Sequence, residues 1–152
     1  WLVATGAGAE RPSPTFFAVA HPRHREQSVL RLSMTTGSVA TSGNSERGIV
    51  VQGQHLGHLL DPSTGQPAPD FGSLTVLAST GLAADALSTG LYVMGPLKAL
   101  EWCSQREGIE VLALVVTSDG LKALASPGLK GRIQAYLPGL RVEFPVFSKP
   151  VH

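Results

Sequence analysis

The alternation of apolar and polar residues predicts short strands along the first half of the chain. Apolar runs separated by glycine, proline and serine are typical of strands joined by turns. Four such runs come first: WLVAT at 1–5, TFFAVA at 15–20, SVLRLS at 28–33 and SVATSG at 38–43. The stretch ERGIVVQGQHLGHLLD at 46–61 predicts a hairpin that turns near Gln52–Gly53, followed by a proline- and glycine-rich loop to residue 72. SLTVLAS at 73–79 then predicts a compact apolar strand.

The spacing of apolar residues changes to a helical period after residue 80. A first helix is predicted over 82–94, and Gly95–Pro96 stops it. Its apolar positions are Leu82, Ala86, Leu87, Leu91 and Met94. A second helix is predicted over 96–107, before Gly108, with apolar positions at Leu97, Leu100 and Trp102.

The remaining segment returns to strand patterns. EVLALVVTS at 110–118 is a continuous apolar run, which suits a sheet covered on both faces. A weak turn or helix is expected near 126–137, and RVEFPVF at 141–147 predicts a last strand, at a sheet edge because Pro145 cannot donate to a ladder. We therefore predict an α+β fold, a mixed and mainly antiparallel sheet with packed helices. One domain over 1–152 is expected, since 152 residues suit a single core.

Composition narrows the classes of partner. Hydrophobic residues make up 43% of the chain, charged residues 15%, and the net charge of +1 gives no electrostatic case for a nucleic-acid partner. The most basic stretch, HPRHR at 21–25, is better explained as a solvated loop than as a phosphate-binding track. Cys103 is the only cysteine, which excludes an internal disulfide, and its helical setting favours a packed thiol. No run reaches the roughly 18 apolar residues of a membrane helix.

Two polar positions on the first predicted helix are candidates for metal binding. Asp85 and Thr89 lie four residues apart and therefore project from one face, with Ser88 beside Thr89. A carboxylate and a hydroxyl supply the oxygen ligands that Mg²⁺ prefers. The alternative is that Asp85 caps or solvates the first helical turn, where acidic residues are favourable. Spacing alone favours this alternative.

Two further polar clusters come earlier in the chain. His58 stands in a leucine-rich run and can serve as a general base or as a donor to phosphate oxygens, although a hydrogen-bonded strand histidine explains it slightly better. The DPSTG stretch at 61–65 is explained by turn chemistry. In TSGN at 41–44 the small residues let a ligand approach the backbone, and an ordinary hairpin turn explains them equally well.

Taken together and in order, these motifs closely resemble those of the ApbE family. They are ATSGN at 40–44, HLLDPSTGQP at 58–67, SLTVLAS at 73–79 and ADALSTGLYVMG at 84–95. The family comprises Mg²⁺-dependent FAD:protein FMN transferases, whose members show a TSG segment, then H-[IL]-[IL]-D-P-x-T-G-x-P, then A-D-[AG]-x-[ST]-T. The resemblance covers about residues 16–118.

The resemblance implies roles for individual residues. Asp85 and Thr89 fall at the family's magnesium positions, and Ser88 at a neighbouring position that contributes in some members. His58 matches a histidine needed for activity, and Leu59 a position that contacts FAD through its backbone. Thr41, Ser42, Gly43 and Asp61 are expected at the FAD site on the same grounds. For Asp85 and His58 these roles reverse the preference drawn from spacing alone.

The resemblance also implies an activity. FMN would be transferred from the substrate FAD to a threonine of an acceptor flavoprotein, with release of AMP and Mg²⁺ as the cofactor. Two alternatives stay open, a Mg²⁺-dependent FAD pyrophosphatase and a non-catalytic domain that binds flavin or a partner.

The D-x-G-G-x-x-K-G segment of the family is absent from these 152 residues. The chain is therefore expected to be the C-terminal portion of the family domain, with an upstream segment or a second chain completing the FAD site. For location, the resemblance suggests the periplasm or an anchor on the outer face of a membrane, with the cytoplasm as the alternative.

Overall fold

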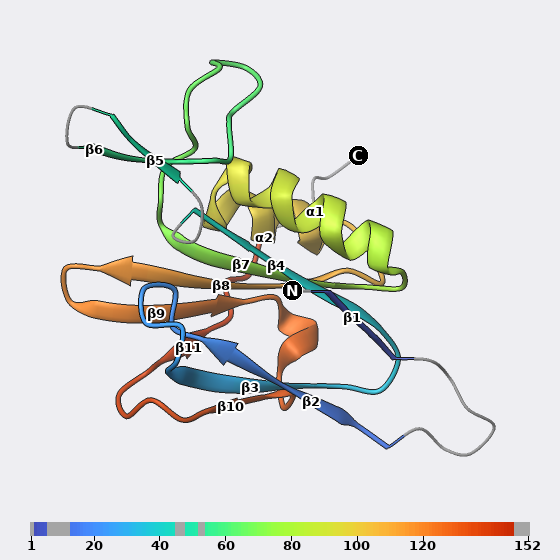
Figure 1. The fold of residues 1–152 in the computed structure, drawn as a ribbon. Helices are drawn as coiled ribbons and strands as arrows, with labels where there is room; N and C mark the ends of the chain where they lie inside the picture. Colours follow the sequence, from blue (N-terminus) through green and yellow to red (C-terminus); the bar gives the residue numbers. More distant parts are fainter. Residues whose placement is uncertain (1, 6–12, 45–47, 52–53, 148–152) are drawn as a thin grey trace.

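The computed structural model describes residues 2–5, 13–44, 48–51 and 54–147, which form two β-sheets, a β-hairpin and two α-helices (Figure 1). The strands are β1 Leu2–Thr5, β2 Thr15–Ala20, β3 Ser28–Met34, β4 Gly37–Gly43, β5 Gly48–Val51, β6 Gln54–Gly57, β7 Gly72–Ala78, β8 Glu110–Thr117, β9 Gly120–Ala125, β10 Ile133–Ala135 and β11 Val142–Glu143. The helices are α1 Gly81–Met94, α2 Pro96–Ser104 and the short 3₁₀ turn η1 Pro127–Leu129.

The larger sheet has six strands in the order β1-β4-β7-β8-β9-β11. Its neighbouring strands are antiparallel, except that β11 runs parallel to β9. A smaller antiparallel sheet has the order β10-β3-β2, and β5 pairs with β6 alone. The predicted α+β fold with a mixed, mainly antiparallel sheet is confirmed.

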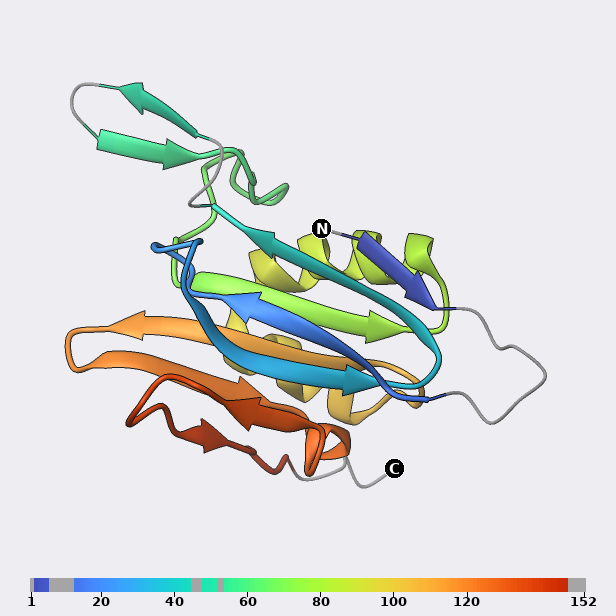
Figure 2. The same ribbon diagram turned by 60° about the horizontal axis from the view of Figure 1, so that its bottom comes forward.

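The two faces of the larger sheet are covered by different layers. Both helices lie on one face, and the small sheet lies on the other (Figures 1 and 2). Successive side chains of a strand point to opposite faces, so on β7 Leu74 and Val76 pack against the helices and Leu77 packs against the small sheet. β8 alternates in the same way, which confirms that this apolar strand is covered on both faces.

Helix α1 begins where predicted but buries a different face. The hydroxyl of Thr80 caps it by accepting a hydrogen bond from the N–H of Ala83 at 3.2 Å. Its buried residues are Ala84, Ser88, Leu91 and Tyr92. Leu82 is 82% exposed and Met94 41% exposed, so their predicted place on the apolar face is wrong. Ala86, also predicted on the apolar face, is exposed as well. The buried residues share one face of the helix, which packs on β4 and β7, and Leu82, Ala86 and Met94 lie outside that face.

Helix α2 ends at Ser104, three residues before its predicted end at 107. The N–H of Arg106 bonds the carbonyl of Cys103 at 2.9 Å, a tighter turn that closes the helix before Gly108. Leu97 is 58% exposed rather than part of the apolar face. Cys103 is buried and its thiol donates to the carbonyl of Ile109 at 2.8 Å, which confirms the packed thiol.

The segment 126–137 is only partly the turn or helix that was predicted. It begins with η1 but continues into β10, whose Ile133 pairs with Leu32 of β3. This strand exists because a partner far away in the sequence supplies its hydrogen bonds. β11 lies at the sheet edge as predicted, although it spans only Val142–Glu143.

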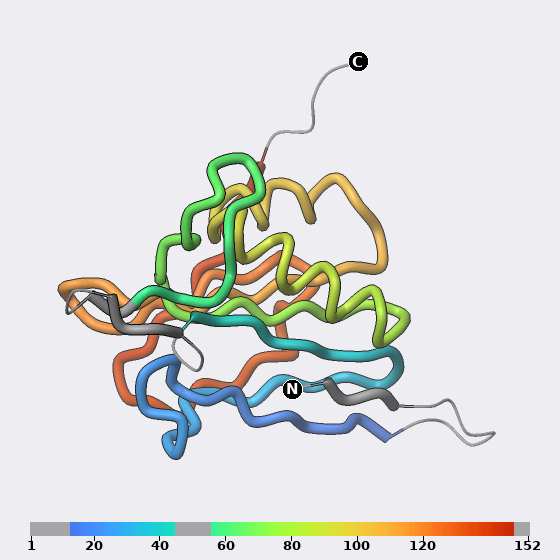
Figure 3. The backbone as a smooth tube through the Cα atoms, turned by 45° about the horizontal axis from the view of Figure 1, so that its top comes forward, coloured from blue at the N-terminus to red at the C-terminus, as the bar shows by residue number. Residues whose placement is uncertain are grey.

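Within the described residues, β1 covers only part of the β4 edge. β1 pairs only with Gly37–Ala40, so on that side none of the described strands pairs with Thr41–Gly43. The chain then forms the predicted β5–β6 hairpin, whose turn at 52–53 lies outside the described residues. The segment 58–71 returns beside the C-terminal end of α1 (Figure 3). No helix in the described part of the chain has the length and apolarity needed to cross a membrane.

Candidate functional site

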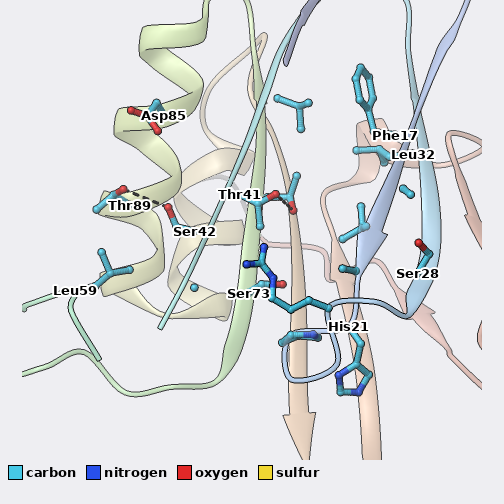
Figure 4. A pocket seen from close by; sticks show the side chains of 18 of the residues that line it. Phe17, His21, Ser28, Leu32, Thr41, Ser42, Leu59, Ser73, Asp85 and Thr89 are labelled. Carbon is cyan, nitrogen blue, oxygen red and sulfur yellow. Dashed lines mark hydrogen bonds between the residues drawn. The ribbon is translucent and has the colours of Figure 1, made fainter. Parts of the chain in front are cut away.

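A cavity of about 950 Å³ opens at the free end of β4. Segments that are distant in the sequence line it: β2 and β3 with the loop between them, the ends of β4 and β7, residues 58–59, and α1 (Figure 4). Asp85, Thr89, His58, Leu59, Thr41, Ser42 and Gly43 all line this cavity. The structure thus brings seven of the nine predicted site residues together, while Asp61 and Ser88 do not line the cavity.

Asp85 and Thr89 form one corner of the cavity. They stand one helical turn apart on α1, and both side chains are exposed. Thr80, five residues ahead of Asp85, caps the helix, and the first turn contains no acidic residue. Helix capping therefore does not account for Asp85. The two residues place a carboxylate and a hydroxyl on the same wall (Figure 4).

The hydroxyl hydrogen bonds behind this corner have a fixed direction. Ser88 is fully buried, and its hydroxyl donates to the carbonyl of Asp85 at 2.9 Å. A serine has one hydroxyl proton, so Ser42 must be the donor in the 2.8 Å bond between Ser42 and Ser88. Thr89 must then donate to Ser42 in the 3.2 Å bond between them. The oxygen lone pairs of Thr89 remain available to the cavity.

The TSG segment is the open end of a strand and not a hairpin turn. Ser42 points to the helices, while Thr41 points to the other face and shares a 2.8 Å hydroxyl hydrogen bond with Thr75. A Cβ on Gly43 would come within 2.9 Å of the carbonyl oxygen of Gly72, so the contact between β4 and β7 requires this glycine. Thr41, Ser42 and Gly43 line the cavity, and none of the described strands pairs with them on the β1 side.

Asn44 holds the segment with His58 and Leu59 against β4, a role that the sequence analysis missed. It is 2% exposed, its Oδ1 accepts from the N–H of Leu59 at 3.1 Å, and its Nδ2 donates to the carbonyl of Ala68 at 2.8 Å. A side chain at Gly57 would collide with the Asn44 amide. Asn44 is the last residue of the TSGN motif, but the sequence does not show its role because its hydrogen-bond partners lie in another loop.

His58 and Leu59 reach the cavity in different ways. His58 is exposed and lines the same cavity as Asp85, as expected for a residue that acts on a ligand there. The N–H of Leu59 is bonded to Asn44, and its carbonyl accepts from the N–H of Ala68 at 2.8 Å. A ligand therefore meets the side chain of Leu59 or the second lone pair of its carbonyl.

Asp61 is used in the turn that follows. Its carboxylate accepts from the N–H of Ser63 at 2.8 Å and from the Ser63 hydroxyl at 2.7 Å, and its carbonyl accepts from the N–H of Gly65. The Ser63 hydroxyl, and then the Ser63 N–H, lower the pKa of the Asp61 carboxyl. Gly65 has a φ of 68°, which favours glycine. This is the turn chemistry expected for DPSTG.

A second anchor fixes the same loop to α1. The hydroxyl of Tyr92 donates to Asp70 at 3.2 Å, and the rings of Tyr92 and Phe71 stack with centroids 4.5 Å apart. Burial, with the Asp70 carboxylate nearby, raises the pKa of Tyr92, so the phenol remains a donor. The loop that carries His58 is thus held at both ends.

The opposite wall of the cavity comes from β2 and the loop after it. It includes the side chains of Phe16, Phe17, Val19, His21 and Arg25. The basic stretch 21–25, which the sequence pattern predicts to be a solvated loop, contributes two of these residues. The fold brings His21 and Arg25 to the cavity because β2 and β3 lie across the face of the larger sheet (Figure 2).

The donor set determines which cations suit the site. Within the described residues, no three His, Cys, Asp or Glu side chains gather as a preformed metal site. The Asp85 carboxylate and the Thr89 hydroxyl can contribute two oxygen ligands to a hard cation.

Comparison with known proteins identifies the family. The sequence model of the ApbE family matches residues 2–113. The chain belongs to the ApbE family. A curated relative, the FAD:protein FMN transferase of Escherichia coli, is 37% identical over 119 residues, which are 77% of this chain and 34% of the relative.

Two solved structures of ApbE proteins share the fold. The ApbE protein of Thermotoga maritima has a TM-score of 0.66 and 34% identity, over 78% of this chain and 38% of that one. The flavin transferase ApbE of Vibrio cholerae has a TM-score of 0.58 and 32% identity, over 80% of this chain and 38% of that one. The chain spans about a third of the length of the curated relatives it matches.

Proposed function

We propose that this chain forms part of an FAD:protein FMN transferase, and that the cavity at the end of β4 holds the diphosphate of FAD. One observation carries the proposal: Asp85 and Thr89 of α1 line a single cavity with His58, which comes from a distant segment of the chain. The volume of about 950 Å³ suits a ligand of this size. Curated relatives with the name FAD:protein FMN transferase support it.

Mg²⁺ is the ion that we assign to the corner on α1. Its preference for oxygen ligands matches the Asp85 carboxylate and the Thr89 hydroxyl oxygen. Because Thr89 donates its proton to Ser42, and Ser42 donates to Ser88, the lone pairs of the Thr89 oxygen accept no hydrogen bond within this group of hydroxyls. Ser88 supports the corner from behind, because its buried hydroxyl holds Ser42. Mg²⁺ takes about six oxygen ligands, so water, phosphate oxygens and groups outside the described residues supply the others. When bound, the ion neutralises charge on the phosphate oxygens and on the leaving group.

The reaction itself is a displacement at phosphorus. The hydroxyl of an acceptor threonine attacks the FMN-side phosphorus of FAD, a P–O bond forms to the threonine, and the anhydride bond to AMP breaks. We assign His58 as the group that takes the hydroxyl proton, since histidine exchanges protons near neutral pH and this one faces the cavity.

The β4 edge and the adjoining loop position the substrate. The backbone at Thr41–Gly43, which none of the described strands pairs on the β1 side, adjoins the space for the diphosphate, and Leu59 lines the cavity beside it. Since the chain spans about a third of its relatives' length, we assign the rest of the flavin site to an upstream segment or to a second chain.

The test is to supply the full-length native protein with FAD, Mg²⁺ and an acceptor flavoprotein domain. We expect release of AMP together with covalent flavin fluorescence on the acceptor after denaturing electrophoresis. An acceptor whose threonine is replaced by alanine should stay unlabelled, and EDTA should stop both signals. AMP release without labelled acceptor would indicate an FAD pyrophosphatase, and the absence of both signals would indicate a non-catalytic domain.

A further inference from the structure

The loop between β2 and β3 forms the wall of the cavity opposite α1. Its residues 21–25 read HPRHR, and His21, Pro22 and Arg25 line the cavity while Arg23 and His24 do not. Figure 4 shows His21 and Asp85 on opposite sides of the cavity, with Thr41 and Ser42 between them. The loop therefore faces the corner on α1 across the β4 edge.

Hydrogen bonds and packing hold this loop in place. The N–H of His21 bonds the carbonyl of Gln27 at 2.8 Å, and the N–H of Gln27 bonds the carbonyl of His24 at 2.9 Å. Pro22 is buried, and its ring lies against Gly72, where a Cβ would come within 3.3 Å of the Pro22 Cγ. Arg25 thus extends from a fixed support, which reduces the entropy lost when a ligand binds.

Few charged side chains line the cavity, and their signs suit a diphosphate with a bound Mg²⁺ ion. Of the described residues that line it, Arg25 is the only lysine or arginine and Asp85 the only acid. A diphosphate diester carries two negative charges, Asp85 adds a third, and Mg²⁺ compensates two of them. Arg25 places a positively charged side chain on the opposite wall of the cavity. The arginine fork also matches phosphate oxygens geometrically.

His21 is prepared to act as a neutral donor beside Arg25. The backbone N–H of Arg23 donates to its Nδ1 at 3.1 Å, so the neutral ring carries its proton on Nε2. Burial, with the positive charges of His24 and Arg23, lowers the pKa of His21. At neutral pH the ring can therefore offer an Nε2–H to a ligand without adding a full charge.

We propose that the 21–25 loop is a phosphate subsite, in which Arg25 binds oxygens of the FAD phosphate that lies farther from the Asp85–Thr89 corner. His21 is the weaker, neutral donor of the same subsite. This inference rests on the proposed function and deepens it, because it names the residues that recognise the second phosphate. It also predicts that the site prefers dinucleotides over riboflavin, which has no phosphate.

The experiment compares Arg25→Gln with Arg23→Gln in the full-length native protein. Both variants remove one positive charge from the same exposed loop, but only Arg25 lines the cavity. Binding of FAD, riboflavin and inorganic pyrophosphate is measured by calorimetry, with Mg²⁺ and again with EDTA. We expect Arg25→Gln to weaken FAD and pyrophosphate by about ten- to a hundredfold in both buffers, as for loss of a charged hydrogen bond, and to leave riboflavin unchanged. Arg23→Gln should bind all three like the wild type.

The possible results separate this inference from the proposed function. If the wild type cleaves FAD and the two variants bind FAD equally well, the phosphate subsite is wrong and the proposed function stands. If the wild type does not bind FAD but binds pyrophosphate through Arg25, the loop binds phosphate, but both its assignment to FAD and the proposed function are wrong. Arg25→Lys keeps the charge without the fork and should show intermediate affinity; wild-type affinity in Arg25→Gln with an intact thermal transition would overturn the inference.

Discussion

Ser42 stands at the centre of the hydroxyl cluster that supports the metal corner. It donates to the buried Ser88 and accepts from Thr89, and Ser88 donates to the Asp85 carbonyl. The one-proton limit of each hydroxyl orders the chain of hydrogen bonds. Thr89 is thereby oriented with its lone pairs toward the cavity.

Replacement of Asp85 tests the metal corner directly. Asp85→Asn keeps the size of the side chain but removes the anionic oxygen that Mg²⁺ prefers. We expect Mg²⁺-dependent AMP release from FAD in the full-length protein to fall by about a hundredfold or more, with an unchanged thermal transition, because Asp85 is exposed. Asp119→Asn, an exposed carboxylate in the β8–β9 turn, serves as the control. Full AMP release by Asp85→Asn at limiting Mg²⁺ would remove Asp85 from the site.

Ser42→Ala tests the orientation of Thr89. The alanine leaves Thr89 without its acceptor and Ser88 without its donor, and a hydrogen bond of this kind contributes about 1 kcal/mol. We expect the Mg²⁺ concentration for half-maximal AMP release to rise about fivefold. Ser42→Thr keeps the hydroxyl and should restore the wild-type requirement. An unchanged Mg²⁺ requirement in Ser42→Ala would show that the cluster is only structural.

Among the elements, the segment 57–71 depends on tertiary contacts rather than on regular structure. Asn44 bonds Leu59 and Ala68 from beneath it, and Tyr92 of α1 bonds Asp70 at its end. The turn at 61–65 is closed by its own hydrogen bonds. These hydrogen bonds hold His58 in position although the segment that carries it is not a regular strand.

The buried amide of Asn44 provides a test at this scale. Asn44→Ala leaves the Leu59 N–H and the Ala68 carbonyl without partners, and each unsatisfied buried group costs about 1–3 kcal/mol. We expect the free energy of unfolding, measured by urea titration, to fall by about 2–4 kcal/mol. Gln134→Ala, an exposed amide in β10, should change it by less than about 0.5 kcal/mol. A loss no larger than that of Gln134→Ala would mean that Asn44 does not hold the loop.

For the whole molecule, the larger sheet separates two hydrophobic cores, one under the helices and one under the small sheet. Cys103 of α2 belongs to the first of these cores. Burial, with the Glu110 carboxylate nearby, raises the pKa of its thiol to about 11. The reactivity of this thiol therefore shows whether the core beneath the helices has opened.

Thiol chemistry gives a pH-dependent prediction. The folded pKa of about 11 exceeds the ordinary value of 9.0, so the native state binds more protons and is favoured below pH 9.0. This contribution is lost as pH rises from 9.0 through about 11. We expect the free energy of unfolding, measured by urea titration, to fall less between pH 9.0 and about 11 in Cys103→Ala than in the wild type. A thiol-reactive dye at pH 8 should label the unfolded protein much faster than the native one; equal rates would contradict the burial of Cys103.

The sequence by itself determined the α+β class, the polar residues of α1 and most element types, though not the strands β9 and β10, since these features depend on local periodicity and chain-local motifs. The spacing of Asp85 and Thr89 is enough to place both on one helical face. The family motifs also named His58 and Thr41–Gly43 as parts of one site.

Only the tertiary structure decided which residues share the cavity. Arg25 and Asn44 acquire their positions from β2 packing across the larger sheet and from a loop that returns to β4. The same reason explains β10, whose hydrogen bonds come from β3, and the exposed Leu82, which lies on the side of α1 away from the buried Ala84. Local patterns carry no information about such partners, because the contacts join segments that meet only when the layers pack.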